Sequence, residues 1–160
     1  MKGPFGKLLV LINGSEASVS AAKYAVALAR AYHSELVAVY VVDTASLRQL
    51  VLSRIFVPDE SAEYEERLEE SGVRLLNYAK DIAKNAGFPM ETKMLKGAIA
   101  GEVIKAADDC KADCILLGGW DRGSSLRDVL MDSYREIMRS ASCPVLVVRG
   151  PKAEEACRGL

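Results

Sequence analysis

Two segments rich in glycine and hydroxyl side chains have the residue types that bind phosphate groups. Residues 13–15 read Asn-Gly-Ser, and residues 118–125 read Gly-Gly-Trp-Asp-Arg-Gly-Ser-Ser. When such a segment leads into a helix, its backbone N–H groups and the positive helix end can hold a phosphate. A strand-to-helix loop also needs glycine for positive φ and serine for capping. Spacing alone favours this structural role, because neither GxxxxGK[ST] nor GxGxxG occurs.

Cysteine and serine offer other chemistry, which the sequence does not support. Cys110 and Cys114 are spaced C-x3-C, but the single histidine, His33, lies far away, and a structural zinc site needs four ligands. No activating base can be assigned to a cysteine nucleophile, and no GxSxG elbow surrounds a serine. We therefore expect no metal site and no catalytic residue, and the protein is not expected to be an enzyme.

Hydrophobic patterning supplies the elements that would position these segments. Continuous apolar runs rich in branched residues are typical of strands that helices cover on both faces, and spacings of three and four indicate helices. Strands are predicted at 8–12, 35–43, 90–96, 113–119 and 143–149, and helices at 16–32, 59–86, 100–110 and after residue 125. The alternation predicts an α/β fold, a doubly wound five-stranded parallel sheet with helices on both faces. Residues 44–58 are expected to be mobile or partly helical.

Length, charge and cysteine content set the class of protein. With 160 residues and half of them hydrophobic, we predict one domain over residues 1–150 and a frayed polar tail over 151–160. A net charge of -1 without a long block of one sign disfavours nucleic-acid binding. The apolar run near the N-terminus is too short for a membrane span or a signal peptide, so a cytoplasmic protein with four free thiols is expected.

In such a sheet the ligand site lies at the carboxyl ends of the strands, where the connections change direction. Residues 13–15, 41–43 and 118–125 should converge there. Trp120, the only tryptophan, falls in the last segment. It is expected either to cover a ligand or contact a partner, or to be a partly buried anchor.

The opening LLVLINGSEAS, the strand AVYVVD, and the later DCILLGG and SASCPVLVVRG resemble the universal stress protein family, from Lys7 to Gly150. In nucleotide-binding members the loop after the fourth strand reads Gly, two residues, Gly, nine residues, then Gly and Ser or Thr. Aligned through Leu126, this chain has Gly119 first, Arg122 second and Asp132-Ser133 last, so two of three glycines are missing. A register shifted by one residue fits no better. Asn13 replaces the family's acidic residue.

The resemblance implies a site whose residues depart from the family pattern. Asp132 would place a carboxylate near phosphate charges, while the Arg122 guanidinium could partly compensate. We therefore expect ATP or another adenine nucleotide to bind weakly or not at all. The candidate nucleotide-binding residues are Asn13, Gly14, Ser15, Val41, Gly118, Gly119, Arg122, Ser124, Asp132 and Ser133.

Two functions remain open at this point. The first is a noncatalytic stress-response or regulatory protein with a degenerate nucleotide site, and the second is an adenine-nucleotide switch with at most slow hydrolysis. An unrelated small enzyme lacks a catalytic constellation. The last strand, Val145 to Val148, predicts a homodimer, because an apolar edge strand without Pro or Lys invites pairing with its own copy.

Overall fold

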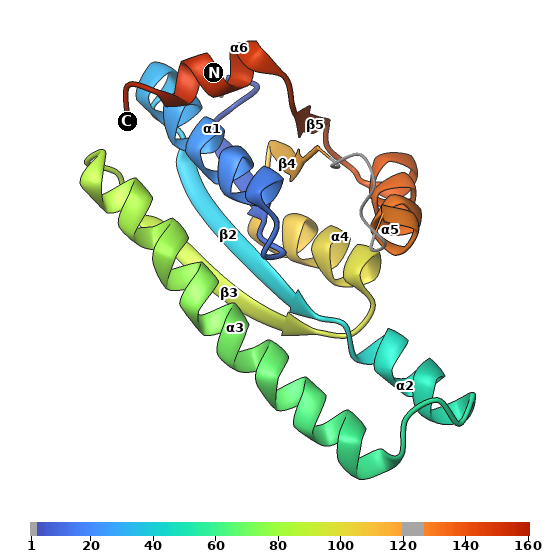
Figure 1. The fold of residues 1–160 in the computed structure, drawn as a ribbon. Helices are drawn as coiled ribbons and strands as arrows, with labels where there is room; N and C mark the ends of the chain where they lie inside the picture. Colours follow the sequence, from blue (N-terminus) through green and yellow to red (C-terminus); the bar gives the residue numbers. More distant parts are fainter. Residues whose placement is uncertain (1–2, 120–126) are drawn as a thin grey trace.

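The computed structural model describes residues 3–119 and 127–160, and its centre is a five-stranded parallel sheet (Figure 1). The strand order is β3-β2-β1-β4-β5. The strands are β1 (Lys7–Leu11), β2 (Glu35–Val42), β3 (Met90–Lys96), β4 (Cys114–Gly118) and β5 (Val145–Val148). Each lies within its predicted range or begins one residue before it, and β3, whose alternating residues predict a strand nearer the sheet edge, is an edge strand.

Helices cover both faces of the sheet, which explains why the central strands are apolar on both sides. One face carries α1 (Glu16–Tyr32), α3 (Pro58–Asn85) and α6 (Pro151–Cys157), and the other carries α4 (Ile99–Cys110) and α5 (Arg127–Ser140). Leu8, Val10 and Ile12 pack toward the first face, and Leu9 and Leu11 toward the second. The predicted doubly wound α/β fold is confirmed.

Helix α1 packs closely on the sheet because its buried side is made of small side chains. Ser15 caps it by accepting a hydrogen bond from the Ser18 N–H at 3.1 Å. The completely or almost completely buried alanines are Ala21, Ala22, Ala25 and Ala29. The same helix approaches β4, so its N-terminal turn lies beside the predicted site.

Two segments that the sequence left without definite structure are helical. The region after β2 begins with α2 (Thr44–Leu52), whose first turn is capped by Asp43 through a hydrogen bond from the Ser46 N–H at 3.0 Å. The expectation of a frayed tail was wrong, since residues 151–157 form α6. The Cys157 thiol reaches the Ser20 carbonyl oxygen at 3.8 Å, and Ala153 packs against the core, so α6 is held against α1.

The strand order places the direction change between β1 and β4. β1 pairs with β2 on one side and with β4 on the other. The connection from β1 runs outward to β2 and β3, and the chain then returns through α4 to β4. A ligand site in this architecture is expected where β1 and β4 end.

Candidate functional site

The loop that follows β1 is closed by its own polar groups. The Asn13 side-chain oxygen accepts hydrogen bonds from the Ser15 N–H at 3.1 Å and the Ser15 hydroxyl at 2.6 Å. Gly14 has a φ of 85°, a conformation that glycine adopts at little cost. The three residues predicted to contact a ligand therefore first serve the turn and the helix cap, as the structural interpretation of the sequence requires.

The side-chain nitrogen of Asn13 forms a hydrogen bond to a different element. Its amide nitrogen donates to the hydroxyl of Tyr134 at 3.1 Å, which joins the end of β1 to α5. Tyr134 is buried among side chains from β1, β2 and α4. Burial raises the pKa of Tyr134, and the hydrogen bond with Asn13 lowers it in part, so the phenol is neutral at physiological pH. This contact ties the loop after β1 to α5.

Both glycines at the end of β4 are explained by close packing. A Cβ on Gly118 would lie 2.4 Å from the backbone carbonyl carbon of Ala17 in α1. A Cβ on Gly119 would lie 2.8 Å from the Arg149 Cβ, and the Gly119 N–H donates to the Val148 carbonyl oxygen at 2.8 Å. Glycine is needed at both positions whether or not a ligand is bound.

Asp132 and Ser133 line a cavity of about 350 Å³ on the α4 and α5 side of the strand ends. Asp43 and Glu136 line the same cavity, so three carboxylates face this space. Asp132 has an exposed side chain whose Oδ1 lies 3.7 Å from an Arg135 guanidinium nitrogen. A concentration of carboxylates opposes the binding of a polyphosphate.

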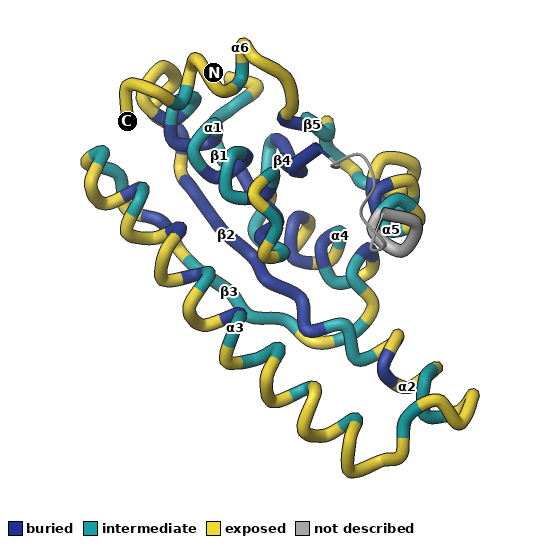
Figure 2. The backbone as a smooth tube through the Cα atoms, in the orientation of Figure 1, coloured by how far each residue is buried: buried dark blue, intermediate teal, exposed yellow. Residues whose placement is uncertain are grey.

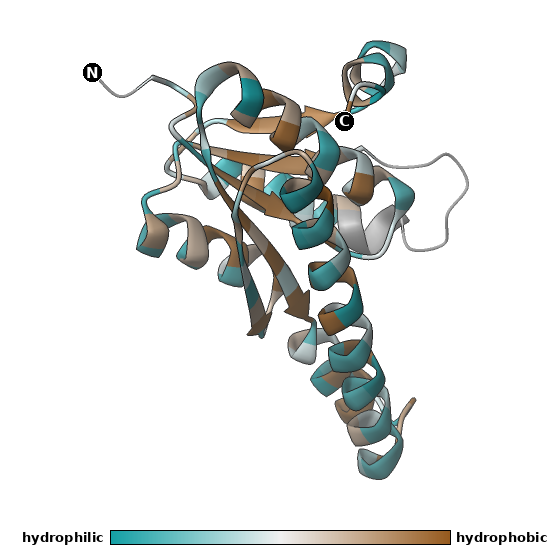
Figure 3. Ribbon diagram, turned by 90° about the vertical axis from the view of Figure 1, so that its left-hand side faces the viewer, coloured by the Kyte–Doolittle hydropathy of each residue, from teal (hydrophilic) through white to brown (hydrophobic). Residues whose placement is uncertain are grey.

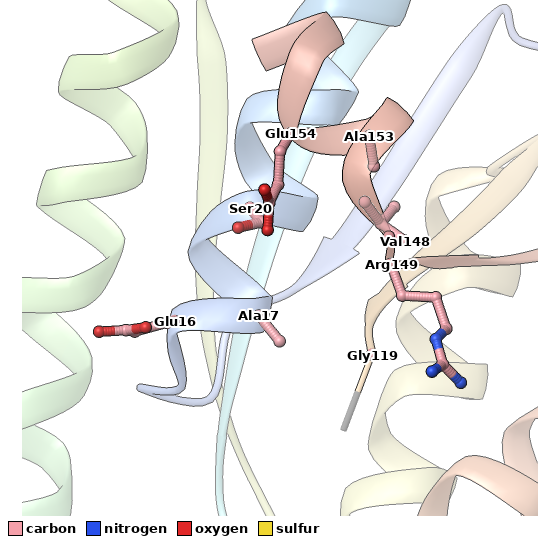
Figure 4. Close-up of a pocket in the computed structure, with 9 residues that line it drawn as sticks. Glu16, Ala17, Ser20, Gly119, Val148, Arg149, Ala153 and Glu154 are labelled. Carbon is pink, nitrogen blue, oxygen red and sulfur yellow. The ribbon is translucent and has the colours of Figure 1, made fainter. Parts of the chain in front are cut away.

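A second cavity, of about 240 Å³, lies on the other side of the strand ends, between α1, β5 and α6 (Figure 4). Gly119, Ser20 of α1 and Glu154 of α6 are on its wall, and in this view the Arg149 side chain extends away from Ser20 and Glu154. The other lining residues are Glu16, Ala17, Val148, Gly150 and Ala153. Sequence reasoning missed this cavity because its wall includes α6, which was expected to be a frayed tail.

The predicted nucleotide-binding residues therefore do not all line one cavity. Val41 is buried in the core against α4 and α5, and neither cavity includes it or residues 13–15. Gly119 faces one cavity, and Asp132 and Ser133 face the other. Trp120, Arg122 and Ser124 lie outside the described residues, so their expected roles stay predictions.

The described residues carry no arrangement for metal or disulfide chemistry. Within residues 3–119 and 127–160, no group of three or more His, Cys, Asp or Glu side chains is placed to hold a metal ion. All four cysteines are free, and burial raises the pKa of Cys114 to about 11. No helix in the same part of the chain is both long enough and apolar enough to cross a bilayer.

Comparison with known proteins assigns the family. The model of the "Universal stress protein family" matches residues 4–149. The universal stress protein MJ0531 of Methanocaldococcus jannaschii is 33% identical over 153 residues, covering 94% of this chain and 85% of that protein.

Solved structures share the fold. The structure of MJ0577, also from Methanocaldococcus jannaschii, has a TM-score of 0.75 at 21% identity and covers 93% of this chain and 99% of its own. A universal stress protein in complex with cAMP has a TM-score of 0.63 at 21% identity, covering 90% of this chain and 96% of its own. The Archaeoglobus fulgidus protein in complex with dAMP has a TM-score of 0.61 at 16% identity, covering 92% and 100%. From the match over residues 4–149 and the relative at 33% identity, the chain belongs to the universal stress protein family.

Proposed function

We propose that this protein is a noncatalytic stress-response or regulatory member of its family, cytoplasmic and homodimeric, whose nucleotide site has degenerated. The hydrogen bond between Asn13 and Tyr134 carries the proposal. It uses the polar group at the position where nucleotide-binding relatives have an acidic residue, and it joins the two segments that would flank the ligand. A nucleotide placed between these two segments would break this bond and leave a buried phenol without its partner, which costs about 1–3 kcal/mol.

Electrostatics support the same conclusion. Asp43, Asp132 and Glu136 line the same cavity as Ser133, the last residue of the predicted nucleotide-binding pattern. Mg-ATP carries net negative charge, and the Arg135 guanidinium is already paired with Asp132. The expected affinity for ATP is therefore low.

Calorimetric titration with Mg-ATP tests the proposal directly. We expect a dissociation constant well above the micromolar level, weaker than about -8 kcal/mol. The universal stress protein solved with cAMP, titrated with cAMP, is the positive control for the method. A micromolar or tighter constant for ATP would contradict the proposal.

A matched pair of variants separates charge from bulk at Asp132. Replacement by Asn removes only the charge, whereas replacement by Gly also removes the side chain from the predicted phosphate path. We expect Asp132→Gly to strengthen ATP binding more than Asp132→Asn does. Asp109→Asn, which changes an exposed carboxylate on α4, should leave binding unchanged.

A second candidate function is binding of an adenine mononucleotide as a switch. Family structures in complex with cAMP and with dAMP favour it, because these ligands have one phosphate and meet less repulsion from carboxylates than ATP does. Titration with AMP and with cAMP distinguishes the two functions. Micromolar binding of either ligand, with ATP weak, would favour the switch.

A further inference from the structure

An apolar surface projects from the body of the molecule on a helical hairpin. We name residues 44–66 the arm; it consists of α2, the turn after it and the first turns of α3. The arm extends past the carboxyl ends of β2 and β3, and most of its surface is exposed (Figures 1 and 2). Its exposed hydrophobic side chains are Leu52 (68% exposed), Ile55 (65%), Val57 (56%) and Tyr64 (44%). Such a cluster of large apolar side chains marks an interaction surface more often than an isolated one does.

The turn of the arm is ordered, so it holds these side chains outward. The N–H groups of Ile55 and Phe56 donate to the Leu50 carbonyl oxygen at 2.9 and 3.2 Å, which ends α2. The Phe56 ring packs on Tyr64 of α3 with ring centroids 5.8 Å apart. A surface presented by an ordered turn loses little conformational entropy when it binds.

The arm also has a groove that apolar side chains can enter. A space of about 340 Å³ lies between α2 and α3; its apolar lining residues are Leu47, Val51, Pro58 and Ala62, and its polar ones are Thr44, Arg48, Ser61 and Glu65. In Figure 3 the helices at the lower end of the view are mostly teal, with short brown, hydrophobic segments between. Protruding apolar side chains and a partly apolar groove on one hairpin can form the two halves of a self-complementary contact.

Positive and negative side chains lie on different parts of the arm. Arg48 and Arg54 lie on the α2 side, and Asp59, Glu60 and Glu63 lie at the start of α3. Among the described residues none of these five side chains forms an ion pair. When two arms pack around a twofold axis, α2 of each faces α3 of the other, and opposite charges meet twice.

We propose that the arm is an interface between two copies of this chain. The partner's Leu52 or Ile55 enters the groove, and the arginines on α2 meet the carboxylates at the start of α3. The 23 residues of the arm, 44–66, match the roughly 20–30 residues that each side of a stable interface contributes. This inference does not rest on the nucleotide site or on the strand β5, which is at the opposite edge of the sheet from β3.

Sedimentation equilibrium of the full chain carrying Val147→Lys tests the arm, because that change disfavours pairing through β5. We expect concentration-dependent dimerisation with a dissociation constant in the micromolar range. Leu52→Ser with Ile55→Ser should weaken it at least tenfold. The matched control is Val73→Ser with Tyr78→Ser, which removes two exposed apolar side chains from the later part of α3 and should change nothing.

Charge reversal tests whether the molecule that binds the arm is a second copy of this chain. Arg48→Glu with Arg54→Glu, and separately Asp59→Lys, Glu60→Lys and Glu63→Lys, should each weaken self-association. Mixing the two variants should restore a dimer that contains one chain of each. A chain with Val147→Lys that stays monomeric up to about 100 µM, or a mixture that does not associate, would overturn the proposal and would leave a basic partner as the occupant to test.

Discussion

Asn13 and Tyr134 are 121 positions apart, yet a hydrogen bond joins them beside the end of β1. Asn13 closes its own turn with its side-chain oxygen and uses its nitrogen to hold the buried phenol. An acidic side chain at this position could accept from Tyr134 but could not donate to it. The single exchange from a carboxylate to an amide therefore fits a site whose polar groups satisfy one another rather than a ligand.

Cys114 gives a prediction about alkaline stability. Burial raises the pKa of its thiol from 9.0 to about 11, so the folded chain keeps a proton that the unfolded chain loses first. The unfolded state then binds fewer protons, and stability should fall as pH rises from 9 to 11. Urea unfolding at pH 8 and pH 10.5 should show a smaller loss for Cys114→Ala than for the unmodified chain.

The matched control for Cys114→Ala is Cys110→Ala, which removes a half-buried thiol from the end of α4. The unmodified chain and the control should lose similar stability between the two pH values. Equal losses for all three proteins would show that Cys114 does not carry the effect.

At the scale of elements, the contact between α1 and β4 depends on one glycine. A methyl group at Gly118 would lie 2.4 Å from the backbone of Ala17, and backbone cannot move aside as a flexible side chain can. We expect Gly118→Ala to destabilise the protein by about 1–3 kcal/mol in chemical denaturation. The loss should appear without any ligand present.

Gly101 serves as a comparison, because the expected change in stability has the opposite sign. Gly101 lies in α4, is exposed, and a Cβ there would have no neighbour within 4 Å. Gly101→Ala should stabilise the helix by about 0.5–1 kcal/mol, because alanine loses less backbone entropy. If both substitutions had the same sign, the packing explanation for Gly118 would fail.

The elements that could be predicted are those whose pattern is local. Buried strands such as β1 and β4 are continuous apolar runs, and α1 has a capping serine and regularly spaced alanines, so sequence alone located them. Helix α6 is only seven residues long and polar, and it forms where Ala153 and Cys157 dock on the core and α1. Contacts of this kind join positions that are distant in the sequence, and no local sequence pattern predicts them.

The sequence predicts where a site is expected but not which groups surround that place. A parallel sheet with right-handed connections follows from the alternation of strands and helices, and a site is then expected at the carboxyl ends of the strands. The link between Asn13 and Tyr134, and the groups that line each cavity, depend on how α5 and α6 pack on the sheet. Packing angles and side-chain rotamers of this kind are set by the complete core and not by residue spacing.

At the scale of the whole molecule, the two edges of the sheet differ in the charge of their side chains. At one edge, β3 carries Glu91, Lys93 and Lys96, and Lys96 also pairs with Glu65 and Glu69 of α3. Charged side chains of this kind protect an edge from pairing. At the other edge, Val145 to Val147 of β5 are partly exposed and uncharged. The asymmetry favours β5 over β3 as the edge for pairing with another chain.

We therefore expect β5 to pair with its own copy around a twofold axis. Among the described residues β5 has β4 as its only strand partner, so the backbone groups on its outer side are available to a second chain. Light scattering at micromolar concentration should give a mass of at least about twice the 17.3 kDa of one chain. Val147→Lys should lower that mass, whereas Lys93→Val on the opposite edge should not. The measured mass would contradict the proposal if the unmodified chain were a monomer, since an open apolar edge and a free arm would then both remain without a partner.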